Sequence, residues 1–516
     1  MAKVKELFEF EIDYKKVKKF ELTEQDIEDL KLEQLSVVRK LRKAVTTIIT
    51  AQSRPDFPDD LQYFESYSAN FFPKGKVAIY VNKSIYTTIR ASIEQYIKDL
   101  ADEGYYATAY TVTGDSAVTL RNHIRNQSGI VGSLMVGNLP YIAYEDSSDS
   151  SAVEVFPCDL YFMDTNGTWT NTDSDTNIEK HTGNVAPEIW VGRLWTPTNN
   201  GNDTALLKDY FRRNHNYRKG LFGCTNRGLS FVDDDWTSFG DCGLKKCLNA
   251  ADICTVVNKE DTNENRYKAE LSMHRLWSQV CAHSNTSLHA FRVSSGNGYV
   301  YSSYIKNNSA PKAYYYNLFA CRSGKYTSSD YIGGWYIFDY SKQDKCYGLA
   351  AIASAKTGSM LYFENFYGSM GKGLSIGDAM VQWWKCLGST HEVSEISWHY
   401  GLSILGDPTL TNLSGAVPNK RTPADGTVFD HYPRLTHLSW DPVALPNVTY
   451  EVQTDYYYGV WNYEYNKASI NTIKNIKNTY YDTSFVGAQR GRWRVRAVSG
   501  NVPGPWSDWG YFRYLR

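Results

Sequence analysis

Residues 314–321 read YYYNLFAC, and the polar loop residues 322–324 follow at once. The run is apolar and rich in β-prone aromatic residues, so it predicts a buried strand that delivers the thiol of Cys321 to the start of a loop. A second apolar run, residues 277–282, ends in the same way at His283. If the two strands belong to one parallel sheet, they deliver an imidazole and a thiol to one edge. A cysteine beside a base is reactive, whereas a cysteine alone in a core is inert packing.

The sequence around these two runs alternates between strand and helix patterns. Strands are predicted at 77–81, 107–112, 130–136, 189–191, 229–232, 253–257, 277–282, 315–320 and 348–353, and helices at 89–100, 117–126, 205–216 and 376–387. Repeated β-α-β order predicts an α/β fold with a mostly parallel sheet flanked by helices. Ligands bind at the carboxyl ends of the strands in such sheets.

The texture of the chain changes near both ends. Residues 1–75 predict a helical N-terminal extension or pro-segment, and residues 76–413 hold the α/β pattern. Residues 420–516 instead alternate apolar and polar positions between Pro, Gly and Asn turns, which predicts a separate β-sandwich. Within residues 492–497 the arginines alternate with Trp493, Val495 and Ala497, so we interpret the arginines as a solvated face of a half-buried strand.

Composition excludes several classes of partner. The formal charge is -1, from 55 basic and 56 acidic residues, so no overall field favours nucleic acid. No apolar window approaches the ~18 residues of a membrane span, so we expect no membrane insertion. Residues 1–19 are charged and lack the apolar core of a secretory signal, which favours a cytoplasmic location unless a signal has been removed. Nine cysteines, an odd number without zinc-site spacing, predict mostly reduced, buried thiols.

Five landmarks occur in the order seen in gingipain-type cysteine peptidases, and the chain resembles that family over roughly residues 76–413. They are LMVGNLP (134–140), PEIWVGRL (187–194), the strand end at His283, NLFAC (317–321) and YGLSILGDP (400–408). The resemblance implies a caspase-like fold, a Cys-His dyad and no metal in the chemistry. The C-terminal segment resembles a fibronectin type III module, which implies an immunoglobulin-like β-sandwich that braces the protein or binds a protein partner.

The resemblance assigns Cys321 as the nucleophile and one of two histidines as the base. His283 is preferred because it directly ends an apolar strand, while His289 is expected in the following loop, where it lines the substrate pocket. The family has glycine after its catalytic histidine, and this chain has Ser284, a small residue that still permits close approach of the substrate. The backbone N–H groups of Cys321 and of the region around Ser284 are expected to hold the oxyanion.

Acidic residues follow the strand predicted at 229–232. Asp233, Asp234 and Asp235 are candidates to orient the histidine, and the resemblance favours Asp233 or Asp234, although three consecutive acids also suit a solvated loop. Asp241 lies where some of these peptidases keep an acid that receives a basic substrate side chain. Cleavage after Arg or Lys is therefore a hypothesis.

A group of oxygen-bearing side chains suggests calcium as a second interpretation. Residues 164–169 (DTNGTW) with Asp173 and Asp175 surround a glycine turn, but they lack the spacing of an EF-hand, and an Asx-rich turn explains them as well. We therefore expect no required cofactor.

The sequence thus predicts a cysteine endopeptidase that acts on proteins or peptides. The alternative is a weak or inactive scaffold that keeps the peptidase fold and binds protein partners. In a regulated version of the first prediction, residues 1–75 cover the cleft until they are removed.

Overall fold

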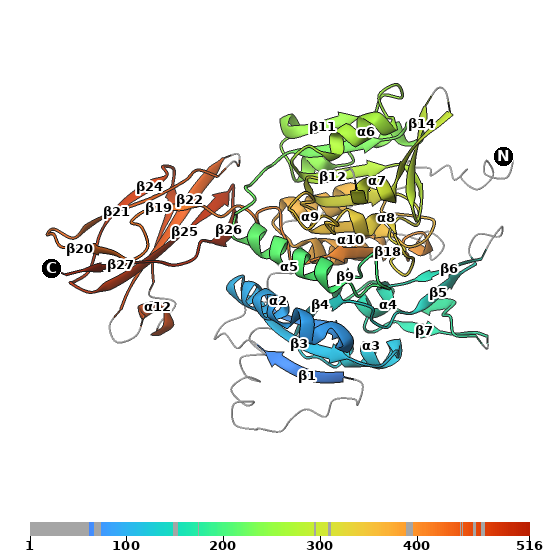
Figure 1. The fold of residues 1–516 in the computed structure, drawn as a ribbon, viewed down its shortest axis with the longest axis horizontal. Helices are drawn as coiled ribbons and strands as arrows, with labels where there is room; N and C mark the ends of the chain where they lie inside the picture. Colours follow the sequence, from blue (N-terminus) through green and yellow to red (C-terminus); the bar gives the residue numbers. More distant parts are fainter. Residues whose placement is uncertain are drawn as a thin grey trace.

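The computed structural model describes residues 61–66, 74–147, 153–173, 175–293, 296–307, 311–388, 396–443, 445, 447–457, 461–465 and 470–515 (Figure 1). Most of the predicted N-terminal extension lies outside the described residues, including the helical pattern near residues 30–41.

One large sheet organises the α/β part of the protein. In the described part of the chain it has eleven strands in the order β1-β3-β2-β4-β9-β18-β17-β16-β12-β10-β11. The bounds are β1 (Leu61–Ser66), β2 (Lys76–Asn82), β3 (Tyr106–Val112), β4 (Ile130–Val136), β9 (Trp190–Leu194), β10 (Gly228–Val232), β11 (Ile253–Val256), β12 (Arg275–Cys281), β16 (Ala313–Phe319), β17 (Ala350–Ser354) and β18 (Leu402–Gly406). Most neighbours pair in parallel, while β1 with β3 and β17 with β18 pair antiparallel. The predicted α/β class with a mostly parallel sheet is confirmed.

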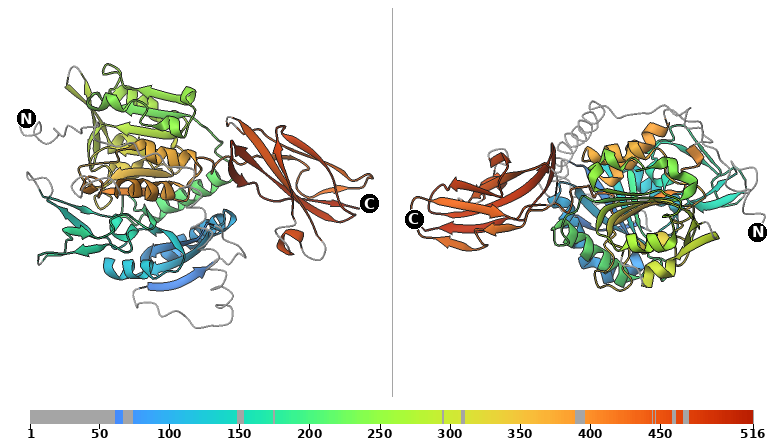
Figure 2. Two further views of the ribbon diagram at one scale, coloured as in Figure 1. Left: turned by 180° about the vertical axis from the view of Figure 1, so that it is seen from behind. Right: turned by 90° about the horizontal axis from the view of Figure 1, so that it is seen from above.

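Helices cover both faces of this sheet, as the view along the sheet in Figure 2 shows. They are α2 (Lys83–Asp102), α3 (Ala117–Arg125), α5 (Thr204–Arg218), α6 (Glu264–Leu271), α9 (Phe363–Gly371) and α10 (Ile376–Gly388), with the short turns α4 (Leu160–Met163), α7 (Ser302–Asn307) and α8 (Ile332–Trp335). The longest, α2, begins where the Asn82 side chain accepts the backbone N–H of Ser84, and its buried isoleucines recur at helical spacing as predicted.

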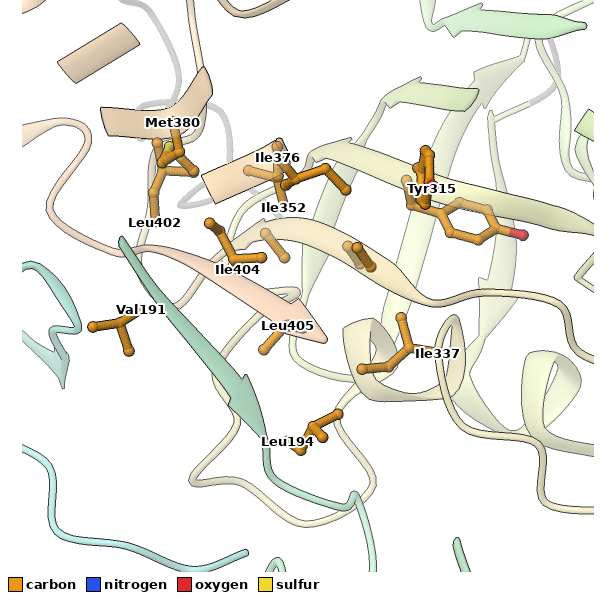
Figure 3. Close-up of a cluster of buried hydrophobic side chains, with 14 of the residues drawn as sticks. Val191, Leu194, Tyr315, Ile337, Ile352, Ile376, Met380, Leu402, Ile404 and Leu405 are labelled. Carbon is orange, nitrogen blue, oxygen red and sulfur yellow. The ribbon is translucent and has the colours of Figure 1, made fainter. Parts of the chain in front are cut away.

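The middle of the sheet is buried on both faces. Figure 3 shows Leu402 and Ile404 of β18 on the same face as Met380 of α10, while Leu405 points to the opposite face with Leu194. These side chains are at most 2% exposed. Burial on both faces explains why the strands read as continuous apolar runs rather than as alternating ones.

Smaller sheets lie beside the large one. The antiparallel sheet β13 (His283–Asn285), β14 (Leu288–Val293) and β15 (Gly296–Tyr301) follows β12 directly. Two further hairpins are β5 (Ala143–Asp146) with β6 (Glu154–Pro157), and β7 (Thr168–Thr170) with β8 (Lys180–Thr182).

The C-terminal region is β-rich and projects from one side of the α/β part (Figure 1). One sheet contains β19 (Lys420–Thr422), β21 (Leu435–Trp440) and β24 (Tyr480–Ser484); the other contains β20 (Thr427–Phe429), β22 (Val448–Tyr456), β23 (Asn471–Ile476), β25 (Arg490–Ser499), β26 (Val502–Trp506) and β27 (Gly510–Tyr514), and the short helix α12 (Asn462–Tyr465) follows β22. These sheets enclose a hydrophobic cluster of their own that includes Leu438, Val452 and Trp493.

The arginines of β25 are not the solvated face that the sequence suggested. Arg492 is only 4% exposed, and its guanidinium lies 4.3 Å from the ring centroid of Trp461 and 4.4 Å from that of Trp509. Arg494 lies 4.4 Å from the Trp509 ring and 4.9 Å from the Trp506 ring. The rings of Trp461, Trp506 and Trp509 cover the arginines of β25. The alternation of residues within one strand cannot reveal such a cover, because it comes from other segments. Trp493 and Val495 on the opposite side are fully buried, as predicted.

Candidate active site

The site is built at the carboxyl end of two neighbouring strands. β12 and β16 pair in parallel, with Cys281 opposite Phe319 at the end of the ladder. The Ala282 N–H then donates to the Phe319 carbonyl at 3.1 Å, so the two backbones continue side by side. His283 and Cys321 each lie two residues beyond that last pair. The structure therefore brings the predicted imidazole and the predicted thiol to the same edge.

Asp235 holds the imidazole of His283. Its Oδ2 lies 2.5 Å from Nε2 of His283, and its Oδ1 accepts a hydrogen bond from Nη1 of Arg292 at 2.8 Å. The ring of Trp236 lies 4.7 Å from the imidazole, centroid to centroid. The carboxylate and the indole together fix the orientation of the ring and leave Nδ1 as the nitrogen that Asp235 does not engage.

The two acids that the resemblance favoured have other partners. Asp233 is buried and accepts the backbone N–H of Arg292 at 3.1 Å, and burial raises the pKa of its carboxyl to about 7. Asp234 pairs with Lys259 at 3.4 Å. A 3₁₀ turn at Asp234–Phe239 begins directly after β10 and rotates the third acid toward His283. The sequence located the acidic cluster but could not predict this rotation.

Opposing influences act on the thiol of Cys321. Burial raises its pKa, while a hydrogen bond from the backbone N–H of Gly358 lowers it. Gly358 has φ +129°, and a Cβ there would lie 2.2 Å from the Trp398 carbonyl oxygen, so only glycine fits the position that contacts the sulfur. Among the residues that the structure describes, the N–H of Cys321 itself donates to no acceptor, which leaves it available to an oxyanion.

Glu154 is a charged neighbour that the sequence did not single out. Its carboxylate raises the pKa of the Cys321 thiol, accepts a hydrogen bond from Nε of Arg322 at 2.6 Å and accepts the Thr357 N–H at 3.0 Å. It lies on β6, a four-residue strand far from Cys321 in sequence. Only a short alternation of polar and apolar residues marks that strand, so no sequence pattern connects Glu154 to the site.

His289 is a core residue. The prediction that it lies in a loop and lines the substrate pocket is wrong, because it lies on β14 and is 0% exposed. Its Nε2 lies 2.9 Å from the Tyr336 hydroxyl, and burial lowers its pKa to about 3. Ser284 lies opposite His289 on β13, where its hydroxyl donates to the Leu288 carbonyl at 2.8 Å and closes the hairpin.

Asp241 lies in the loop after the 3₁₀ turn and is half-buried. Its carboxylate accepts the Gly243 N–H at 2.9 Å and lies 3.5 Å from Nζ of Lys245. The next residue, Cys242, places its sulfur 3.8 Å from the sulfur of Cys281, at the end of the strand that precedes His283. The loop that carries Asp241 is thus packed against the site, although Lys245 offsets part of its charge.

The residues behind the calcium interpretation separate into two groups. Asp164 is buried and lies 2.6 Å from Nε2 of His181. It also accepts the Gly167 N–H at 2.7 Å, so its carboxylate oxygens already contact His181 and the backbone of the turn. Asp173 and Asp175 are exposed, and their carboxylates come within 4.8 Å of each other and of Glu179. Calcium binding there stays a prediction.

No disulfide joins any of the nine cysteines, all of which lie among the described residues, and those at 158, 242, 281, 346 and 386 are buried. Within the described residues, no helix has the length and apolar character to cross a membrane.

No protein-family model and no curated protein matches the chain. Among solved structures, it is similar to a Fn3-like protein from Clostridium thermocellum, with 23% identity over 19% of this chain and 92% of that chain and a TM-score of 0.15. It is also similar to the FN5 domain of Drosophila Lar, with 14% identity over 20% of this chain and 97% of that chain and a TM-score of 0.15. A human fibronectin type III domain shows 15% identity over 19% of this chain and 70% of that chain, with a TM-score of 0.14. These fibronectin type III-like similarities extend over about a fifth of the chain.

Proposed function

We propose that this protein is a cysteine endopeptidase that cleaves protein or peptide amide bonds through Cys321 and His283. The observation that supports the proposal is the parallel pairing of β12 and β16, whose last aligned pair, Cys281 and Phe319, lies two residues before His283 and Cys321, together with the 2.5 Å contact between Asp235 and His283. In this proposal the α/β part is caspase-like and the C-terminal sheets form an immunoglobulin-like, fibronectin type III-like β-sandwich.

The proposed reaction begins with the neutral thiol, because burial raises the pKa of Cys321. As the sulfur attacks the scissile carbonyl carbon, its proton passes to Nδ1 of His283, and Asp235 stabilises the resulting imidazolium. The Cys321 N–H binds the oxyanion. The C–N bond then breaks, and His283 returns the proton to the leaving amine. Water, deprotonated by His283, cleaves the thioester and restores the thiol.

Cleavage after Arg or Lys is the proposed specificity, and Asp241 is the residue that would receive the basic side chain. The packing of its loop against Cys281 supports this role. An Asp241→Asn variant should lose selectivity for Arg and Lys over apolar residues, and equal turnover of apolar substrates by the unaltered protein would remove this assignment.

Turnover of a mixed protein substrate by the Cys321→Ala variant tests the main proposal. We expect loss of cleavage in Cys321→Ala and full cleavage in Cys254→Ala, which removes another half-buried thiol on β11. Cleavage that survives in Cys321→Ala would contradict the proposal.

The second candidate is a peptidase-fold scaffold without turnover that binds protein partners. The raised pKa of Cys321 favours it, because a protonated thiol is a weak nucleophile. The alkylation rate of Cys321 by iodoacetamide separates the two. A rate that falls in His283→Gln indicates a coupled dyad, whereas an unchanged rate indicates the scaffold.

A further inference from the structure

The small sheet β13–β14–β15 extends outward from His283 and has one buried and one open face. Antiparallel pairing aligns His283 with Ala290 and Ala290 with Tyr299, so these three side chains share a face. The intervening residues His289 and Val300 are 0% exposed, which identifies their face as the inner one. The face that carries His283 is therefore the outer face.

A hollow of about 390 Å³ lies beside β15, the last strand of this sheet. Its lining residues are Lys268, Tyr299, Tyr301, Ser303, Tyr304 and Asn307. Tyr299 and Tyr301 are 40% and 50% exposed, and their rings lie 6.0 Å apart. Large exposed aromatic side chains gathered around a hollow are typical of a binding surface.

Lys268 gives the hollow a positive charge. Its Nζ lies 5.1 Å from the Tyr304 ring centroid, and no carboxylate among the described residues pairs with it. Glu264, one helical turn earlier on α6, is directed at Gly298 instead, since a Cβ there would lie 1.9 Å from its Oε2. An ammonium group beside tyrosine side chains, without a carboxylate partner among the described residues, suits an acidic side chain of a ligand.

We propose that the outer face of β13–β15 binds the part of the substrate that follows the scissile bond, and that the hollow receives an acidic side chain. This inference rests on the proposed function. His283 protonates the leaving amine, so the chain after the cut begins at the imidazole. Ala290 lies between His283 and Tyr299 on this face, and its small side chain leaves room for a peptide to pass over the sheet.

Strand spacing sets the position of the acidic residue. Two strand intervals of about 4.8 Å separate β13 from β15, so the tyrosines begin roughly 10 Å from His283. An extended chain advances about 3.3 Å per residue and covers that distance in about three residues. The acidic side chain is therefore expected at the third to fifth residue after the cut.

Peptides of two lengths test the proposal. Long substrates extend six residues past the cut and carry either Glu or Gln at the third, fourth or fifth of them, and short substrates end after the second. We expect kcat/KM about fivefold higher for the best Glu peptide than for its Gln counterpart, a value typical of one exposed charge pair. Lys268→Gln should abolish this preference and Lys268→Glu should reverse it. Lys208→Gln, which removes an exposed lysine of α5, should retain it.

The outcomes separate this inference from the proposed function. If both short and long peptides are cleaved but Glu and Gln are equivalent, or if the preference persists in Lys268→Gln, the hollow is not the acidic subsite. A Glu preference of the same size at every position would also overturn it, because it would reflect long-range attraction. If no peptide is cleaved, the peptidase proposal fails, and fluorescence anisotropy of the Glu and Gln peptides on the Cys321→Ala protein still decides whether Lys268 binds the acid.

Discussion

His283 and His289 are six residues apart but differ in burial and in hydrogen-bond partner. His283 emerges at a sheet edge and contacts a carboxylate, whereas His289 points into the core against Tyr336. Their separation by an even number of residues does not place them on one face, because the hairpin turn between β13 and β14 intervenes. Pairing across that turn decides which imidazole is buried and which lies at the end of the large sheet.

Turnover of peptide substrates should depend on His283 and should not depend on His289. We expect His283→Gln to reduce kcat by at least about 1,000-fold, since it removes the acid-base group. His289→Gln should retain most of the turnover of peptide substrates at pH 7, because its side chain does not face the site. Loss of activity in a folded His289→Gln protein would contradict the assignment of the base.

Stability in acid should depend on His289. Its pKa is about 3 in the folded protein and about 6.5 when unfolded, so the unfolded chain binds more protons between these values. The stabilisation is complete above pH 6.5 and is lost as the pH falls toward 3, by up to about 5 kcal/mol. Urea unfolding of His289→Gln at several pH values should show a shallower loss than the unaltered protein.

Asp233 should give the stability of the protein the opposite dependence on pH. Its pKa is about 7 in the folded protein, above the 3.8 of a free carboxyl, so the folded state retains a proton that the unfolded chain releases. Stability should therefore fall as the pH rises from about 4 to 7, by at most about 1.4 kcal/mol per pH unit. Asp233→Asn should remove that slope in denaturant titrations while peptide turnover persists. Asp235→Asn should instead reduce turnover.

At the scale of elements, β25 shows how a strand can be misread when its neighbours are unknown. The sequence predicted its alternation correctly, and the inward side chains are buried. The outward arginines, however, lie between the rings of Trp461, Trp506 and Trp509, residues that belong to other segments. Cation–π contacts of partly desolvated arginines stabilise a fold more than exposed charges do.

Trp509 contacts both Arg492 and Arg494, so Trp509→Ala should lower the free energy of unfolding of the C-terminal sheets by about 2 kcal/mol. Arg513→Ala, at an exposed position on β27, is the matched control and should change it by less than about 0.5 kcal/mol. Guanidinium unfolding followed by tryptophan fluorescence measures both. Equal effects of the two substitutions would show that the ring contacts add little.

In the part of the chain that the structure describes there are two hydrophobic clusters, one in the α/β part and one between the C-terminal sheets. Contacts between the parts include the ion pair of Lys219 with Asp508 at 2.8 Å and the approach of Val502 to Gly373. Exposed ion pairs contribute little, so the two clusters should unfold with weak coupling.

Calorimetry should therefore show two transitions. Val495→Ala removes methyl groups from the C-terminal cluster and should lower the free energy of unfolding for one transition by about 2 kcal/mol. Ile352→Val in β17 should lower the free energy of unfolding for the other transition by about 1 kcal/mol. A single transition that both substitutions shift equally would show that the clusters form one cooperative unit.

Part of the candidate site could be predicted from the sequence, and part of it could not. The apolar runs that end at His283 and Cys321 predicted the two strands, because burial on both sheet faces demands uninterrupted apolar residues. The choice of Asp235 over its two neighbours depends on the turn after β10. The approach of Glu154 to Cys321 depends on a hairpin more than 160 residues away in the chain.

The succession of strands and helices, the change to β structure after residue 413 and the two polar ends of β12 and β16 can be predicted from the amino-acid sequence, because they follow from local periodicity. Packing in three dimensions was needed to show which carboxylate contacts the imidazole, which histidine is buried and which rings cover the arginines. Those outcomes depend on strand register and on desolvation by residues distant in sequence, and neither is encoded in any single segment.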